Sequence, residues 1–194
     1  MNGSSGERVW SERGSATVEF AFTSVMFIFL AFGIVEYGMV FSEQHAVTAL
    51  AREGASLASR NLTTNGNMLA MLTSTEGTLE LNGNPQKYAI FLAQINGSLG
   101  PGLPPVCTVT AVGTLTGAGI AAPTPGGQCN LPNNLWNRLQ WQGAPINAVG
   151  VNQFTVVQVN YQHTPLTPVG GLSATLGGNA HGNTAHILQS QAIF

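Results

Sequence analysis

The sequence predicts an α+β fold, in which a long N-terminal transmembrane helix precedes a small C-terminal domain that contains an antiparallel sheet. Two observations support this prediction. Residues 20–41 form an apolar segment with a single charge, and the chain after residue 60 alternates short apolar segments with Gly, Asn and Pro. We expect the sheet to pack on the exposed half of the helix, because neither buries its apolar face alone.

The apolar segment from Phe20 to Phe41 is 22 residues long, and its only charge is Glu36. As a helix it measures about 33 Å, which is enough to cross a bilayer core. The uncharged part before Glu36 covers only about 24 Å. We therefore expect this intramembrane carboxylate near a membrane interface or against a partner helix.

Two other interpretations of the segment were weighed against a retained anchor. A cleaved signal peptide would have Arg8 and Arg13 as its basic region and a cleavage-like Ala49–Ala51, but the apolar core is long and that site lies well past its end. A buried helix of a soluble protein is disfavoured because the segment is apolar on every face. For a retained anchor, the two arginines place the N-terminus in the cytoplasm, since no Lys or Arg follows before Arg52.

The helix is expected to continue beyond the membrane. Residues 42–60 contain no Pro and are rich in Ala, so one helix from about Ser15 to Arg60 would measure roughly 69 Å. Small and apolar residues recur every seven positions and form a narrow seam for another helix or a domain. These residues are Val40, Val47 and Gly54, together with Leu50 and Leu57. Glycines along the helix either permit close helix–helix approach or only weaken it locally, and the sequence favours neither. They are Gly33, Gly38 and Gly54.

The chain is poor in charge. Charged residues make up 7% of it, against roughly 25% in typical soluble domains. It contains no Asp, its last acid is Glu80, and only Lys87 and Arg138 carry charge after that position. Such a surface suits a subunit held in a membrane or an assembly better than a freely diffusing protein. The six basic residues are too dispersed for a nucleic-acid footprint.

No catalytic or metal-binding motif is apparent. The region after Glu80 has no acid to act as a general base, and no nucleophile or phosphate-binding motif occurs, so we predict no enzyme activity and no cofactor. His163, His181 and His186 share the C-terminal region, but the last two are five residues apart in a Gly/Asn-rich segment. Helical ligand pairs are three or four residues apart, so no metal site is predicted.

Cys107 and Cys129 are the only cysteines, and both follow the apolar segment. In an oxidising compartment we expect them to pair, closing a loop that contributes about 3 kcal/mol in the chain-entropy model. Two reduced buried thiols are the alternative. Pairing requires that this part of the chain is exported.

Local patterns predict the elements of the exported domain. Turns are expected at Asn65-Gly66, Asn82-Gly83 and Asn96-Gly97, and short helices at Asn67–Ser74 and Pro85–Ile95. Strands are expected at Val106–Val112, Phe154–Tyr161 and Thr184–Phe194, while Leu135–Trp141 fits either a strand or a short helix.

The residues before the apolar segment form a second motif. Gly14 is followed by four residues and then by Glu19-Phe20 at the start of the long helix, which resembles the type IV prepilin processing site. The resemblance implies that a membrane peptidase cuts after Gly14, so that the mature chain begins at Ser15.

Glu19 gives this motif a physical rationale. A carboxylate in hydrocarbon costs about 2.5 kcal/mol or more. The α-ammonium that cleavage creates would neutralise Glu19 of a neighbouring subunit and set the register between helices. Alternatively, Glu19 lies at the headgroup boundary and binds water.

A wider resemblance covers residues 14 to about 60. Three pieces occur in order around one apolar segment: Glu19-Phe20, Gly33–Gly38 and Ala51–Ala55. Together they resemble TadE-like proteins, the minor pilins (pseudopilins) of tight-adherence pilus systems. Val156–Tyr161 followed by Thr164–Pro168 is loosely similar to the end of such chains, whereas residues 61–150 resemble nothing identified.

The resemblance implies a chain organised as a cytoplasmic leader (1–14), a helix (15–60, spanning the membrane at about 20–41) and an exported domain (61–194). It implies a protein of the bacterial inner membrane with a periplasmic domain, or one carried into an extracellular pilus. Its partners would be the lipid bilayer, other pilins with the pilus assembly platform, and the prepilin peptidase. The alternative is an unprocessed single-pass anchor whose periplasmic domain is a binding module.

Overall fold

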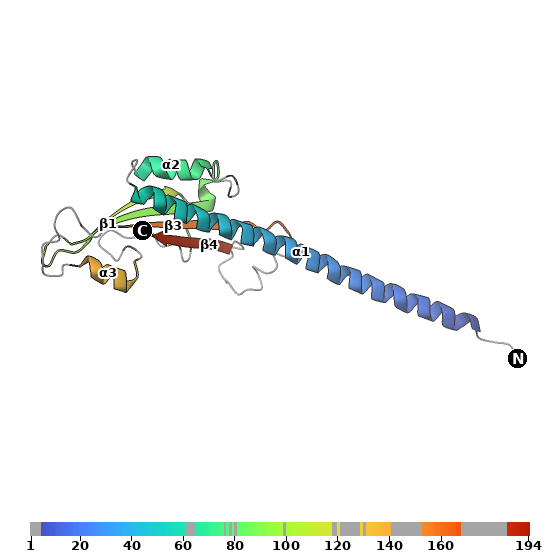
Figure 1. Cartoon of the computed structure of the whole chain (residues 1–194). Helices are drawn as coiled ribbons and strands as arrows, with labels where there is room; N and C mark the ends of the chain where they lie inside the picture. The colour runs from blue at the N-terminus through green and yellow to red at the C-terminus, as the bar shows by residue number, and fades with distance from the viewer. Residues whose placement is uncertain are drawn as a thin grey trace. The chain divides into compact units, whose positions relative to one another are not determined.

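The computed structural model has an α+β fold and describes residues 5–60, 65–75, 77, 79, 81–98, 100–117, 120, 129, 131–140, 153–167 and 186–194. Its elements, in chain order, are α1 (Ser5–Ser59), α2 (Asn65–Thr75), the 3₁₀ helix η1 (Pro85–Lys87), β1 (Tyr88–Asn96), β2 (Val106–Gly113), α3 (Asn133–Leu139), β3 (Gln153–His163) and β4 (His186–Ile193) (Figure 1). The described strands form one sheet of order β2-β1-β3-β4, and every neighbouring pair is antiparallel. The predicted fold class is therefore confirmed.

The chain divides into two compact units. One comprises Met1–Val40 with Pro165–Thr184, and the other comprises Phe41–Thr164 with Ala185–Phe194. Helix α1 begins at Ser5, whereas the sequence led us to expect a start near Ser15. No proline interrupts residues 5–59, so backbone hydrogen bonding continues unbroken through Gly14.

In the second unit, the C-terminal part of α1 is buried along one stripe. Its members recur at intervals of three and four residues, as one helix face requires. They are Val47, Leu50, Ala51, Gly54, Ala55 and Ala58. A Cβ atom placed on Gly54 would lie 2.8 Å from Leu72 Cδ1 of α2 and 3.2 Å from Val157 Cγ1 of β3. The helix thus packs closely against both elements at the only residue type that leaves room for them.

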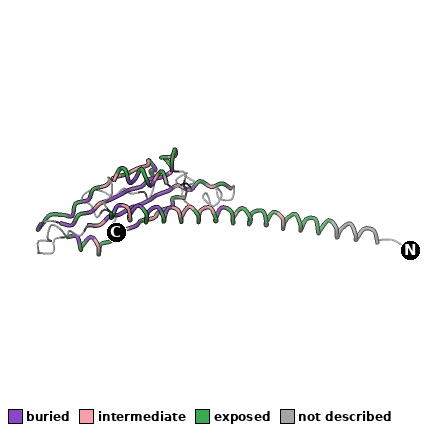
Figure 2. Tube along the Cα trace, turned by 45° about the horizontal axis from the view of Figure 1, so that its top comes forward, coloured by how far each residue is buried: buried purple, intermediate pink, exposed green. Residues whose placement is uncertain are grey.

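Strand β1 corrects one expectation. We predicted a short helix at Pro85–Ile95, but only Pro85–Lys87 is helical, and the chain then enters a strand that lies between β2 and β3. The sequence Tyr88–Asn96 is rich in aromatic and β-branched residues and is buried on both faces from Tyr88 to Ala93. Pairing with two neighbouring strands outweighs the helix-start signal of the proline. Figure 2 shows the buried strands of this sheet in purple.

The remaining local expectations had mixed outcomes. Asn65-Gly66 is not a turn but the first turn of α2, so that expectation was wrong. Asn82-Gly83 does form a turn, in which Gly83 adopts a φ of +92°. The helix at residues 67–74 and the strands β2, β3 and β4 occur close to the predicted positions.

Helix α3 settles the choice left open for residues 135–141. The described part is helical, and Trp136 and Leu139, three residues apart, are buried together against the sheet residues Ile95 and Val156. The expected disulfide joins Cys107 to Cys129 beside this cluster, with an S–S distance of 2.04 Å. This bond ties the edge strand β2 to the segment that leads into α3.

Candidate functional site

The N-terminal half of α1 carries an extended exposed apolar surface. Every large apolar side chain that is exposed between Val18 and Val35 has between 41% and 74% of its surface accessible. Residues 14–59 form one helix that is long and apolar enough to cross a membrane. Because folded soluble proteins rarely expose contiguous apolar patches of this size, the surface suggests a membrane anchor.

The residues of the predicted processing motif lie on α1 and are exposed. They are Gly14, Ser15, Glu19 and Phe20. A Cβ atom on Gly14 would meet nothing within 4 Å. Among the residues that the structure describes, none forms a hydrogen bond or an ion pair with Glu19. The fold therefore does not bring these residues to any other part of the described chain.

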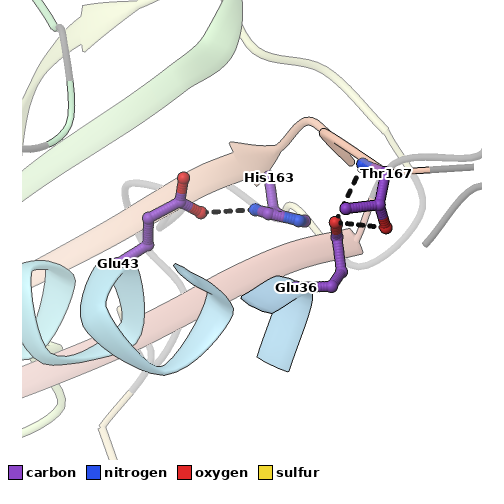
Figure 3. Close-up of polar contacts among 4 residues, drawn as sticks. All are labelled: Glu36, Glu43, His163 and Thr167. Atoms are coloured by element: carbon purple, nitrogen blue, oxygen red, sulfur yellow. Dashed lines mark hydrogen bonds and ion pairs between the residues drawn. The ribbon is translucent and has the colours of Figure 1, made fainter. Parts of the chain in front are cut away.

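Glu36 has a different environment from Glu19. Only 9% of its surface is exposed, and its Oε2 accepts hydrogen bonds from the backbone N–H of Thr167 at 3.1 Å and from Thr167 Oγ1 at 2.9 Å (Figure 3). Both residues belong to the first compact unit. The sequence predicted a membrane interface or a partner helix as the surroundings of Glu36, and the structure adds a hydrogen-bond partner within the same chain. Two donors on one carboxylate oxygen offset much of the cost of removing that oxygen from water.

A second polar contact, in the other unit, was not anticipated from the sequence. His163, the last residue of β3, is 1% exposed, and its Nδ1 lies 2.6 Å from Glu43 Oε2 of α1 (Figure 3). Glu43 follows Glu36 by seven residues, so the two carboxylates project from the same face of the helix. The heptad spacing of the two acids was the available signal, but the pattern search followed apolar residues only. This contact fixes the end of β3 on α1.

The histidines do not assemble a metal site in the part of the chain that is described. Strand register pairs His163 with His186, yet no group of three His, Cys, Asp or Glu side chains that could hold a metal occurs among the described residues. His181 lies outside the described residues. The chemistry of His163 is instead that of a buried imidazole held by a carboxylate.

Comparison with known proteins bears on the helix. The family model of TadE-like protein matches residues 14–56. No curated protein and no solved structure matches the chain. The matched segment contains the exposed apolar surface, Glu19, Glu36 and Glu43, and it starts at the glycine of the predicted processing motif. The resemblance inferred from the three sequence pieces is thus confirmed: over residues 14–56, this chain is TadE-like.

Proposed function

We propose that this protein is a minor pilin (pseudopilin) that acts in the assembly of a tight-adherence pilus and is cleaved after Gly14 by a prepilin peptidase. The TadE-like match supports a protein associated with this pilus system. The observation that carries the finer proposal is the coincidence of three features. The match begins at Gly14, a carboxylate without a partner follows at Glu19, and an exposed apolar helix surface follows that.

Glu19 has a physical reason to require a partner outside its own chain. It stands next to Phe20, the first residue of the apolar segment, and it has no hydrogen bond or ion pair within the described residues. Within hydrocarbon, an ionised carboxylate is stable only when it is paired. Cleavage after Gly14 would supply an α-ammonium at Ser15, and that of a neighbouring subunit would match Glu19 in charge and in depth. The pair would set the register of adjacent helices more than it would add stability.

The proposed location is the bacterial inner membrane, with residues 1–14 in the cytoplasm and the domain in the periplasm. Arg8 and Arg13 precede the apolar segment, and no Lys or Arg follows before Arg52. The Cys107–Cys129 disulfide supports export, because disulfides persist in oxidising compartments. The bilayer, other pilins, the assembly platform and the prepilin peptidase are the proposed partners.

Intact mass and N-terminal sequencing of the membrane-extracted protein test this proposal. We expect a mature chain of 180 residues that starts at Ser15, which is 14 residues shorter than the full sequence. The variant Gly14→Val should retain its leader. Gly38→Val is the matched control, because both glycines are exposed on the same helix and a Cβ on either would meet nothing within 4 Å.

The outcomes separate the proposal from its alternative. Loss of processing in Gly14→Val and in a strain without the peptidase, with normal processing of Gly38→Val, would support the proposal. A chain that begins at Met1 in every strain would refute it and favour an unprocessed anchor with a periplasmic binding module. Glu19→Gln should still be processed but fail to co-assemble with other pilins, whereas Glu53→Gln, an exposed carboxylate on the same helix, should assemble normally.

A further inference from the structure

The turn after β3 displays one large apolar side chain. Leu166 exposes 72% of its surface, although it follows Pro165 and precedes a threonine that is held by hydrogen bonds. No Asp, Glu, Lys or Arg occurs anywhere in the last 56 residues of the chain, so this turn carries no charge that would keep it in water. An exposed leucine alone has no significance, and its position relative to α1 decides what it contacts.

Glu36 fixes that position. Thr167 donates both its backbone N–H and its hydroxyl to Glu36 Oε2, which places Leu166 beside the helix at the level of Glu36 (Figure 3). The turn and this part of α1 belong to the same compact unit. The depth of Glu36 in a bilayer is therefore also the approximate depth of Leu166.

That depth follows from helix geometry. If Phe20 marks the near boundary of a hydrocarbon core about 30 Å thick, the far boundary lies about 20 residues on, near Val40. Glu36 is four residues earlier, so it lies about 6 Å inside that boundary. Tyr37, 71% exposed, lies at the same level, where membrane proteins favour tyrosine.

The turn also meets the requirement that lipid places on a backbone. Unpaired N–H groups are costly in hydrocarbon. Pro165 has no N–H, and the N–H of Thr167 is bound to Glu36. The residues flanking Leu166 therefore present no free backbone donor to the membrane.

We propose that Pro165–Thr167 is a lipid-contacting turn, held at the outer boundary of the membrane by Glu36, in which the Leu166 side chain inserts between lipids. Glu36 is the positioning residue of this second membrane contact. The inference relies on the proposed function only in that α1 must span the bilayer. It makes the exported domain touch the membrane at a defined height along the helix.

Fluorescence quenching in liposomes tests this inference with the full-length protein. Leu166→Cys is labelled with an environment-sensitive fluorophore without reductant, so that the Cys107–Cys129 disulfide remains intact. The liposomes contain lipids that are spin-labelled at a shallow position. Phe29→Cys, at the middle of the apolar segment, reports on the span, and Asn134→Cys, exposed on α3, reports on the aqueous side.

We expect the shallow spin label to quench Leu166→Cys and the deep-lying Phe29→Cys to be shielded from iodide, while Asn134→Cys is quenched by iodide alone. Quenching of Leu166→Cys by iodide alone would overturn the inference while a shielded Phe29→Cys preserved the span. Protection of Leu166→Cys from both quenchers would indicate a protein contact and would overturn it as well. Exposure of Phe29→Cys to iodide would refute the span, and with it the proposed function.

A second pair of variants isolates the role of Glu36. In the Leu166→Cys background, Glu36→Leu removes the acceptor of both Thr167 hydrogen bonds, and we expect loss of quenching by the lipid label. Glu36→Gln retains an acceptor oxygen and should retain the quenching. If Glu36→Leu left the quenching unchanged, Glu36 would not be the residue that positions the turn.

Discussion

The close packing around Gly54 allows a quantitative prediction for the outer unit. A Cβ atom there would lie 2.8 Å from Leu72 Cδ1 and 3.2 Å and 3.6 Å from the two methyl carbons of Val157. Gly54→Val adds two further carbons in the same space, and its branched side chain has little rotational freedom in a helix. Overpacking of this kind costs about 1–3 kcal/mol. The higher helix propensity of valine offsets only about 0.4 kcal/mol of it.

The expected result is a lower midpoint of thermal unfolding, followed by tryptophan fluorescence of the detergent-solubilised full chain. A unit of this size loses about 2–4 °C for each kcal/mol, so Gly54→Val should lower the midpoint by several degrees. The buried Trp136 contributes to the signal from this unit. Gly66→Val is the matched control, because Gly66 is an exposed helical glycine with nothing within 4 Å of its Cβ position.

A double-mutant cycle with Leu72→Ala tests the reasoning itself. Leu72→Ala alone should cost about 2–5 kcal/mol, because the side chain is almost fully buried. It also removes the atom nearest to the new side chain. The double variant should therefore be more stable than the sum of the single effects by about 0.5–3 kcal/mol. If the effects added without coupling, or if Gly54→Val behaved like Gly66→Val, the packing explanation would be refuted.

Two further predictions concern the same unit. Glu43→Ala removes the carboxylate that contacts the buried His163 and should lower the free energy of unfolding by about 1–3 kcal/mol; Glu53→Ala, an exposed acid of α1, should change it by less than about 0.5 kcal/mol. Replacing both Cys107 and Cys129 with serine should cost about 3 kcal/mol for a loop with a sequence separation of 22 residues, measured by urea denaturation against the unmodified protein. An unchanged urea midpoint in either case would show that the contact contributes nothing to the stability of the unit.

Local patterns in the sequence were sufficient for α1 and for three of the strands. The apolar run from Phe20 and the alanine-rich continuation both favour helix over their whole length, so no distant contact is needed to specify α1. Strand β3 is similarly evident from its alternation of β-branched and polar residues. The family match over residues 14–56 falls in this well-specified part of the chain.

Strand β1 shows where local patterns fail. Its residues are apolar on both faces and follow a proline suited to a helix start, so neither periodicity nor capping distinguishes a buried strand from a buried helix. The neighbours β2 and β3 decide the conformation, because they supply backbone partners on both sides. The same limit applies to Asn65-Gly66, whose turn-forming residues begin α2.

The sequence by itself determined the long helix, its apolar surface, the predicted processing motif and the α+β class, because each depends on residues close together in the chain. Only the tertiary structure decided which carboxylates of that helix have partners. Thr167 is 131 residues from Glu36, and His163 is 120 residues from Glu43. Single polar contacts over such separations leave no periodic pattern in a sequence. They form because the sheet brings the end of β3 back to the helix, where the geometry of the whole fold selects the partner.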